Sequence, residues 1–307
     1  MAITRADIAA LIEEEYSTTL LDRATASSTV LSAFTTVPMG AKVQNMPALA
    51  TRPTASFVGE TADTRTKPNT KFSFENKVLT AQEIAAIIVL NEEDLEDATE
   101  DLLANAAALG GEAVGRTLDA AVMFGNNKPA AWTSPDLYAA AVAAGQIYQV
   151  GAGEDDLVGS IFQAAESVDD SGANPDAFLS RGGFKFKLAN LRNTDGTPIY
   201  LPSLSSAPGA VDNVAGLNAY WNKNGAWDRS KALGLVADSS SVLIGVRSDI
   251  QVKFLTEATI GGVNLAENDQ VALRFRARYA YTLADVRGTE GEVVSPVSAI
   301  TAAAAGA

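Results

Sequence analysis

A long polar segment, Gly59–Thr70, constrains what this chain can fold into more than any other feature of its sequence. These twelve residues contain no large apolar side chain, and strand-like stretches precede and follow them in FVGETADTRTKPNTKFSFENKVLT, residues 57–80. A polar arm of this length cannot enter a hydrophobic core, and two strands alone are at best marginally stable in water. The segment therefore needs a surface beyond its own two strands.

Composition narrows the classes of partner that the chain can bind. Hydrophobic residues make up 47% of the 307 residues, which is enough for a substantial core. Acidic residues outnumber basic residues 37 to 23, giving a formal net charge of −14. Binding to nucleic acid or to an anionic membrane usually needs a positive field, so this balance argues against both.

Missing residue types exclude several kinds of chemistry. The chain has no Cys and no His, which excludes disulfides, thiol nucleophiles, Ser-His-Asp triads and zinc sites that use histidine. We expect no cofactor and no metal. The first residues lack the apolar stretch of a signal peptide, and the longest strongly apolar run, Ile84–Leu90, is too short to span a bilayer. These features predict a soluble protein that is not exported.

The longest predicted helix runs from residue 92 to residue 124. Asn91 is a favourable N-cap, and the acidic residues that follow it suit the positive end of the helix dipole. Gly125 is a typical end signal, and Gly110–Gly111 is the point at which we expect a kink. A helix of this extent would span roughly 50 Å, more than an ordinary globular helix.

The second half of the chain divides into a mixed lobe and a strand-rich return. Within residues 157–240, apolar spacing predicts two helices and a buried strand: Leu157, Ile161, Ala164 and Val168; Phe184, Leu188 and Leu191; and Ala177–Ser180. Near the end, alternation predicts a half-buried strand with Arg274, Arg276 and Arg278 on the face opposite to Val271, Leu273, Phe275, Ala277, Tyr279 and Tyr281. The last residues are small, and we expect them to be frayed.

Three groups of side chains are candidate sites, and each has a simpler structural interpretation. The acidic helix start could chelate a cation, but a solvated helix start is the commoner use of Glu92, Glu93, Asp94, Glu96, Asp97, Glu100 and Asp101. The three arginines lie roughly 7 Å apart, a spacing that suits phosphates. Pairing with acidic side chains of this subunit or the next is favoured, with the acidic helix start as the expected partner. Trp221 and Trp227 are interpreted as core or interface anchors rather than as a ligand pocket.

The order of these features resembles the major capsid proteins of tailed bacteriophages, whose fold is shared with encapsulins and with the floor domain of herpesvirus capsids. The matching features are an N-terminal arm, a long polar hairpin, a helix that starts in NEEDLEDA, a lobe with LRNTDGTPIY, then VLIGVRSDIQVKF and VALRFRARYAYTLADV. The resemblance covers about residues 15–287. It depends on the collinear set rather than on any single motif.

The resemblance implies an α+β fold in six parts. Residues 1–54 would form an N-terminal helix and arm, residues 55–80 the extended hairpin loop, and residues 81–156 the first part of a peripheral domain with the spine helix 92–124. Residues 157–240 would form an axial domain that lines the centre of each hexamer and pentamer. Residues 241–287 would return to the peripheral domain as strands, and residues 288–307 would form a C-terminal tail.

The implied function is that of a structural shell protein, not an enzyme, that self-assembles into hexamers and pentamers of an icosahedral capsid around double-stranded DNA. The hairpin would lie over a neighbouring subunit and contact it through Glu60, Arg65, Lys67 and Lys71. Charge pairs within or between subunits would involve Arg274, Arg276, Arg278, Glu92, Glu93 and Asp97. The expected partners are further copies, a separate scaffolding protein, a portal and a decoration protein. DNA would be enclosed without sequence-specific binding, no membrane would be involved, and assembly would take place in the host bacterial cytoplasm.

Some members of this family form Lys–Asn isopeptide crosslinks that a buried Glu assists. Lys67, Lys71 and Lys77 are candidate lysines here, and Asn268 precedes the last strand. However, Val271–Tyr281 contains no Glu, so we predict no autocatalytic crosslinking.

Other functions remain open on the sequence alone. An encapsulin-type nanocompartment that encloses enzyme cargo is the nearest alternative within the same fold. A carboxylate-dependent enzyme would need convergent acids in a pocket, and a cytosolic binding module would use Trp221 and Trp227.

Overall fold

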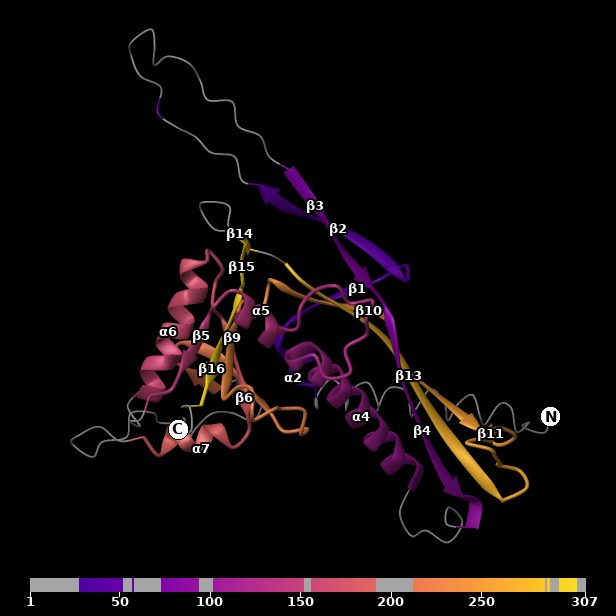
Figure 1. The fold of residues 1–307 in the computed structure, drawn as a ribbon. Helices are drawn as coiled ribbons and strands as arrows, with labels where there is room; N and C mark the ends of the chain where they lie inside the picture. Colours follow the sequence, from indigo (N-terminus) through magenta and orange to yellow (C-terminus); the bar gives the residue numbers. More distant parts are fainter. Residues whose placement is uncertain are drawn as a thin grey trace, which may run out of the picture.

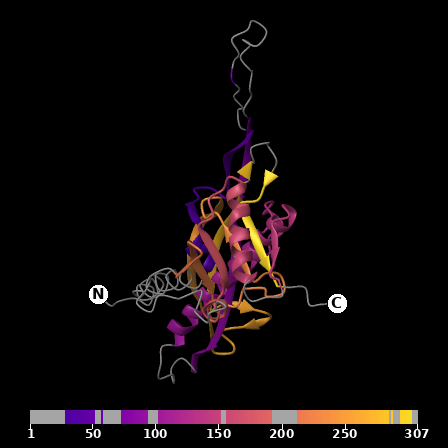
Figure 2. The ribbon, with the colours of Figure 1, turned by 90° about the vertical axis from the view of Figure 1, so that its left-hand side faces the viewer.

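The computed structural model describes residues 28–51, 57, 73–93, 102–151, 156–191, 212–284, 286–287 and 293–302. Long strands on one side and a compact lobe on the other flank a central helix (Figure 1). The described part of the chain is broad in this view and narrow when it is turned by 90° (Figure 2). The described part of the chain is therefore flat rather than spherical.

A four-stranded sheet carries the long strands and has the order β1-β10-β13-β4. Its strands are β1 (Thr35–Pro38), β4 (Gln82–Asn91), β10 (Val242–Leu255) and β13 (Gln270–Leu283). Strand β13 is antiparallel to both of its neighbours, and β1 is parallel to β10. The alternation predicted for β13 is confirmed, because its three arginines are half-buried whereas the apolar residues between and around them are buried.

The spine helix, α4 (Leu102–Phe124), packs against the buried face of this sheet beside the short helix α2 (Thr29–Ala33). Gly125 ends α4 with a φ of 71°, as its sequence predicted. Helix α4 continues through Gly110–Gly111, where the sequence predicts a kink. Glu92 and Glu93 are helical directly after β4, and residues 94–101 of the predicted helix lie outside the described residues.

A two-stranded hairpin projects from the end of this sheet (Figure 1). Strand β2 (Val43–Thr51) pairs antiparallel with β3 (Ser73–Thr80). The partner of β3 therefore comes from the segment that the sequence analysis treated as an arm. Apart from Phe57, the predicted loop between residues 52 and 72 lies outside the described residues.

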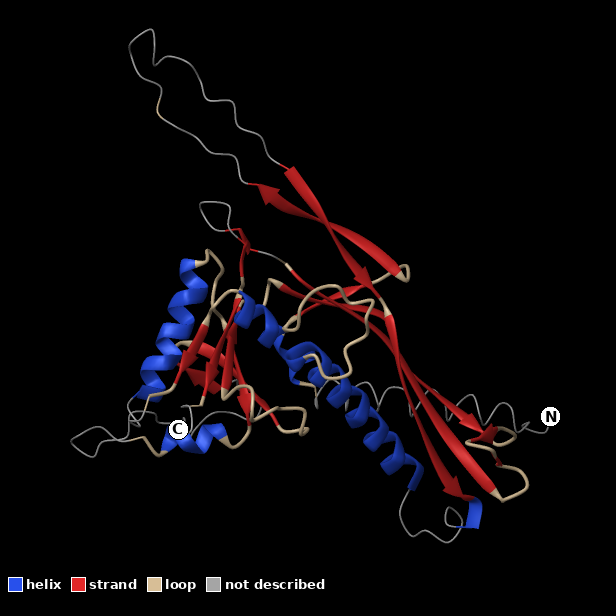
Figure 3. Cartoon of the chain, in the orientation of Figure 1, coloured by secondary structure: helices blue, strands red, loops and turns tan. Residues whose placement is uncertain are grey.

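The lobe is built on a six-stranded sheet with the order β5-β16-β9-β6-β8-β7. Its strands are β5 (Ile147–Gln149), β6 (Ala177–Arg181), β7 (Asp212–Val214), β8 (Leu217–Asn222), β9 (Gly234–Ala237) and β16 (Val297–Thr301). Helices α6 (Asp156–Asp170) and α7 (Phe184–Ala189) form a core with one face of the sheet, while α4 and α5 (Leu137–Ala143) pack on the other. Both predicted helices and the predicted buried strand of this lobe are confirmed (Figure 3).

The C-terminal segment is part of the core, and the prediction of a frayed tail is wrong for Val297–Thr301. Strand β16 lies between β5 and β9, and its first four residues are buried. Small side chains such as Ser298 and Ala299 fit because helices cover both faces of the sheet. Two small two-stranded sheets complete the described chain: β11 (Thr259–Ile260) with β12 (Val263–Asn264), and β14 (Val286–Arg287) with β15 (Val293–Val294).

Candidate functional site

The exposed face of the four-stranded sheet carries the three predicted arginines. Arg274, Arg276 and Arg278 lie opposite Ile87, Ala85 and Glu83 of β4. The Glu83 carboxylate joins two of them, since its Oε2 lies 3.0 Å from Arg276 Nε and 3.3 Å from Arg278 Nη2. The side chains of Glu83, Arg276 and Arg278 are each more than one-third exposed. Each ion pair therefore contributes little to the stability of an isolated subunit.

Among the described residues, the acid that pairs with the arginines is Glu83. Glu92 and Glu93 are exposed just beyond the end of β4, and Asp97 lies outside the described residues. Sequence analysis missed Glu83 because its role depends on the register between β4 and β13, which are far apart in the chain. Pairing of Glu92, Glu93 and Asp97 with arginines of another subunit remains a prediction.

Apolar side chains are left uncovered on the same face. Ile87 is 46% exposed and Val89 is 41% exposed. Ile87 lies directly opposite Arg274, and Arg274 has no hydrogen-bond or ion-pair partner among the described residues. Contiguous apolar side chains rimmed by charge typically mark a surface that another protein covers.

The hairpin of β2 and β3 also has apolar side chains that the described chain does not cover. Val43 is 49% exposed and Val78 is 40% exposed. Leu79 is buried and packs with Met39 and Ala280 where the hairpin leaves the body. The predicted contact residues Glu60, Arg65, Lys67 and Lys71 lie outside the described residues.

A buried carboxylate, Asp119, joins three separate parts of the chain. It lies on α4 and is fully buried. It accepts hydrogen bonds from Ser28 Oγ at 2.6 Å, from the backbone nitrogens of Thr29 at 2.9 Å and Val30 at 3.1 Å, and from Nδ2 of Asn222 at 3.0 Å and of Asn224 at 2.8 Å. The backbone donors form the first turn of α2, and they offset part of the cost of a buried negative charge there. Asp119 thus fixes the N-terminal segment and the lobe to the spine helix.

Burial dominates the ionisation of this group. Loss of solvent raises the pKa of Asp119, and the hydrogen bonds from Ser28, Thr29, Asn224 and Val30 partly oppose that rise. Sequence analysis did not single out Asp119. The available signal was its position beside Leu118 and Val122 on the apolar face of a helix, where a carboxylate needs partners.

Both tryptophans of the lobe have structural roles in the described chain, as their simpler interpretation predicted. Trp227 is buried, donates its indole N–H to Ala232 O at 2.8 Å and meets Phe124 edge to face at 5.2 Å. Trp221 is half-buried and donates its indole N–H to Asp212 at 2.7 Å. Lys185 also pairs with Asp212, and that pairing lowers the pKa of the Asp212 carboxyl.

The described residues contain no group of three or more His, Cys, Asp and Glu side chains that could hold a metal ion. Asp94, Glu96, Asp97, Glu100 and Asp101 of the acidic helix start lie outside them. Among the helices of the described residues, none combines the length and the apolar character that crossing a membrane requires. The described chain offers two surfaces for contact with another protein: a charged sheet face with uncovered apolar residues, and a projecting hairpin.

Comparisons with known proteins agree with that description. The model of the phage capsid family matches residues 9–288. A structure from Mycobacterium phage Adephagia is 43% identical over 100% of both chains with a TM-score of 0.82, and one from Mycobacterium phage Cain is 44% identical over 100% of both with a TM-score of 0.81. The capsid of a native GTA particle shares the fold at 15% identity, covering 90% of this chain and 91% of that one, with a TM-score of 0.61. No protein with a curated description matched. These matches disfavour the encapsulin alternative, and the chain belongs to the phage capsid family as a structural component of a capsid rather than an enzyme.

Proposed function

We propose that copies of this chain form hexamers and pentamers of an icosahedral capsid that encloses double-stranded DNA, with the hairpin of each copy lying on the exposed sheet face of its neighbour. The observation that carries the proposal is the uncovered face at Ile87, Val89 and Arg274. A hairpin that projects from one copy matches a sheet face that lacks a cover on the next. Contacts of this head-to-tail kind close into rings.

The residues of the hairpin loop supply chemistry that this face can use. Glu60 offers a carboxylate for Arg274 of the neighbour, and Arg65, Lys67 and Lys71 offer cations for the acidic residues Glu92, Glu93 and Asp97. Each contact can be weak, because a subunit held at several sites gains from effective concentration.

Different parts of the chain have different places in the proposed shell. The lobe, which comprises residues 157–240 together with β5 and β16, lines the centre of each ring as the axial domain. The spine helix with the four-stranded sheet forms the peripheral domain. The net charge of −14 keeps packaged DNA from adhering to the inner wall. Assembly takes place in the host cytoplasm with a separate scaffolding protein, a portal and a decoration protein, and no covalent crosslinks join the subunits.

Electron microscopy and light scattering of the purified chain, with and without residues 59–70, test this proposal. We expect closed shells or uniform rings of five or six subunits from the complete chain. The chain without residues 59–70 should stay folded by circular dichroism but remain monomeric. Shells that form equally well without the loop would contradict the proposed hairpin contact.

Exchanging the charges of Glu60 and Arg274 tests the proposed contact between them. Arg274→Glu and Glu60→Arg should each lower the assembled fraction, and the double variant should recover it. Heating assembled particles in detergent checks the absence of crosslinks, because a covalent ladder of subunits would contradict it.

A further inference from the structure

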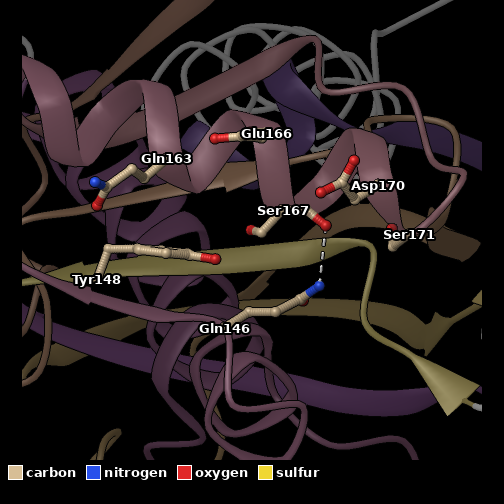
Figure 4. Close-up of a pocket in the computed structure, with 7 residues that line it drawn as sticks. All are labelled: Gln146, Tyr148, Gln163, Glu166, Ser167, Asp170 and Ser171. Carbon is tan, nitrogen blue, oxygen red and sulfur yellow. Dashed lines mark hydrogen bonds between the residues drawn. The ribbon is translucent and has the colours of Figure 1, made fainter.

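A cavity of about 320 Å³ lies between α6 and β5, at one edge of the six-stranded sheet. Figure 4 shows Glu166, Ser167 and Asp170 of α6 above it and Gln146 and Tyr148 below it. The capsid contacts proposed above do not involve this cavity.

Two carboxylates line this cavity together with Gln146, whose side chain is buried. Glu166 and Asp170 are exposed and lie one helical turn apart, and neither has a hydrogen-bond or ion-pair partner among the described residues. Gln146 is 7% exposed. Its Nε2 donates to Ser167 O at 3.2 Å, and its buried Oε1 has no hydrogen bond from the described residues. A buried acceptor without a donor is costly, so its retention needs an explanation.

These acceptors match a ligand that only donates hydrogen bonds and carries positive charge. The ammonium group of Lys and the guanidinium group of Arg have donors and no acceptors, and their bonds to carboxylates are strong. A divalent metal is a poorer match, because the cavity has two carboxylates and hard cations prefer six or more oxygen ligands.

Basic side chains of the described residues lie toward the opposite edge of the same lobe. Helix α6 contains Asp156, Glu166, Asp169 and Asp170 and no Lys or Arg. Toward the other edge of the sheet, Arg181 ends β6, Lys187 lies on α7 with the Lys185 that pairs with Asp212, and Lys223 directly follows β8. A ring of identical subunits in head-to-tail contact brings one edge of each lobe against the opposite edge of the next.

We propose that the cavity between α6 and β5 is a binding site for a basic side chain of the adjacent copy, supplied by Arg181, Lys187 or Lys223. The cation pairs with Glu166 and Asp170 at the cavity that Gln146 also lines. Phe162, which is 55% exposed one turn before Glu166 on α6, adds an apolar contact beside the charge pair. This inference rests on the proposed rings, because it names a contact that holds them together around their centre.

Charge reversal with a matched control tests the site. Glu166→Lys and Asp170→Lys should each lower the assembled fraction at least severalfold at low salt, as measured by analytical ultracentrifugation. Asp169→Lys is the control, because Asp169 is an exposed acid of the same helix that does not line the cavity. Circular dichroism should show all three variants folded, since these side chains are exposed.

A second charge reversal that restores assembly identifies the basic residue that enters the cavity. Combining Asp170→Lys with Arg181→Glu, Lys187→Glu or Lys223→Glu should recover assembly for the residue that enters the cavity. The chain has no Cys, so Asp170→Cys paired with a Cys at one of these three positions should give disulfide-linked copies that are absent from either single variant.

The outcomes separate this inference from the proposed function. A wild-type chain that stays monomeric counts against the rings themselves. Shells that form normally while Glu166→Lys and Asp170→Lys behave like Asp169→Lys, and while no cysteine pair links copies, overturn the proposed contact and leave the capsid function intact.

Discussion

Gly110 of the spine helix lies directly against the ring of Phe275 on β13. A Cβ atom built on Gly110 would lie 2.6 Å from Phe275 Cε2, closer than such contacts occur. Phe275 is fully buried, so its ring cannot turn away into solvent. The glycine therefore sets how closely the spine helix approaches the four-stranded sheet.

Gly110→Ala should destabilise the fold although alanine favours helices. The added methyl group must displace Phe275 or separate the helix from the sheet, at a cost of about 1–3 kcal/mol. Urea unfolding followed by circular dichroism measures the change. Gly159→Ala on α6 is the control, because nothing lies within 4 Å of its added Cβ, and it should stabilise by about 0.5–1 kcal/mol. Equal effects of the two substitutions would refute the close-packing explanation.

Substitution of Asp119 should disconnect the N-terminal segment and the lobe from the spine helix. Asp119→Ala leaves several buried donors without an acceptor and should cost about 3 kcal/mol or more. Asp119→Asn keeps one oxygen for Thr29, Asn222 and Asn224 and should cost less. Urea unfolding gives the order, and Asp228→Asn in an exposed turn serves as the control with a small effect. An Ala variant as stable as the wild type would contradict the role of Asp119.

The contribution of Asp119 to stability should change with pH in the direction opposite to that of most native carboxylates. Because burial raises its pKa in the folded state, the folded chain binds this proton more tightly than the unfolded chain does. The contribution of Asp119 to stability is therefore greatest below its ordinary pKa and falls as pH rises through the raised folded pKa. The unfolding free energy of the wild type relative to Asp119→Asn should decrease over that window. An increase would show that the five hydrogen bonds outweigh burial.

Removal of β16 should unfold the lobe even though it lies near the end of the chain. A chain that ends at Pro296 lacks Val297, Ala299 and Ile300, all fully buried between β5 and β9 or against α6. Hydrogen exchange should show that β6 and β9 lose protection. A chain that ends at Ala302 keeps β16 complete and should retain that protection. Unchanged exchange after the shorter truncation would show that the lobe folds without β16.

Loss of the Glu83 bridge should matter more for assembly than for folding. Glu83→Gln should change the unfolding free energy by less than about 1 kcal/mol, because the pairs with Arg276 and Arg278 are partly exposed. It also frees both arginines on a face that we propose a neighbour covers, so the salt dependence of assembly should change. Parallel measurements of unfolding and of assembled fraction distinguish the two effects. A loss of several kcal/mol in folding would contradict this assignment.

The sequence by itself determined those features that depend on neighbouring residues. The alternation in β13 placed its arginines on one face, the spacing of apolar residues identified α6 and α7, and Gly125 marked the end of α4. The collinear order of these elements also indicated the capsid family, because it depends on the succession of local patterns rather than on any contact.

Only the tertiary structure decided which distant segments meet. Glu83 pairs with Arg276 and Arg278 through the register of two strands almost 200 positions apart. Asp119 accepts hydrogen bonds from residues 28–30 and from Asn222 and Asn224. The small residues of β16 are buried in the core because helices cover both faces of their sheet. In each case the energy comes from burial or pairing between segments far apart in the chain. Local patterns therefore could not predict it, although they could show where a lone carboxylate or a polar arm required a partner.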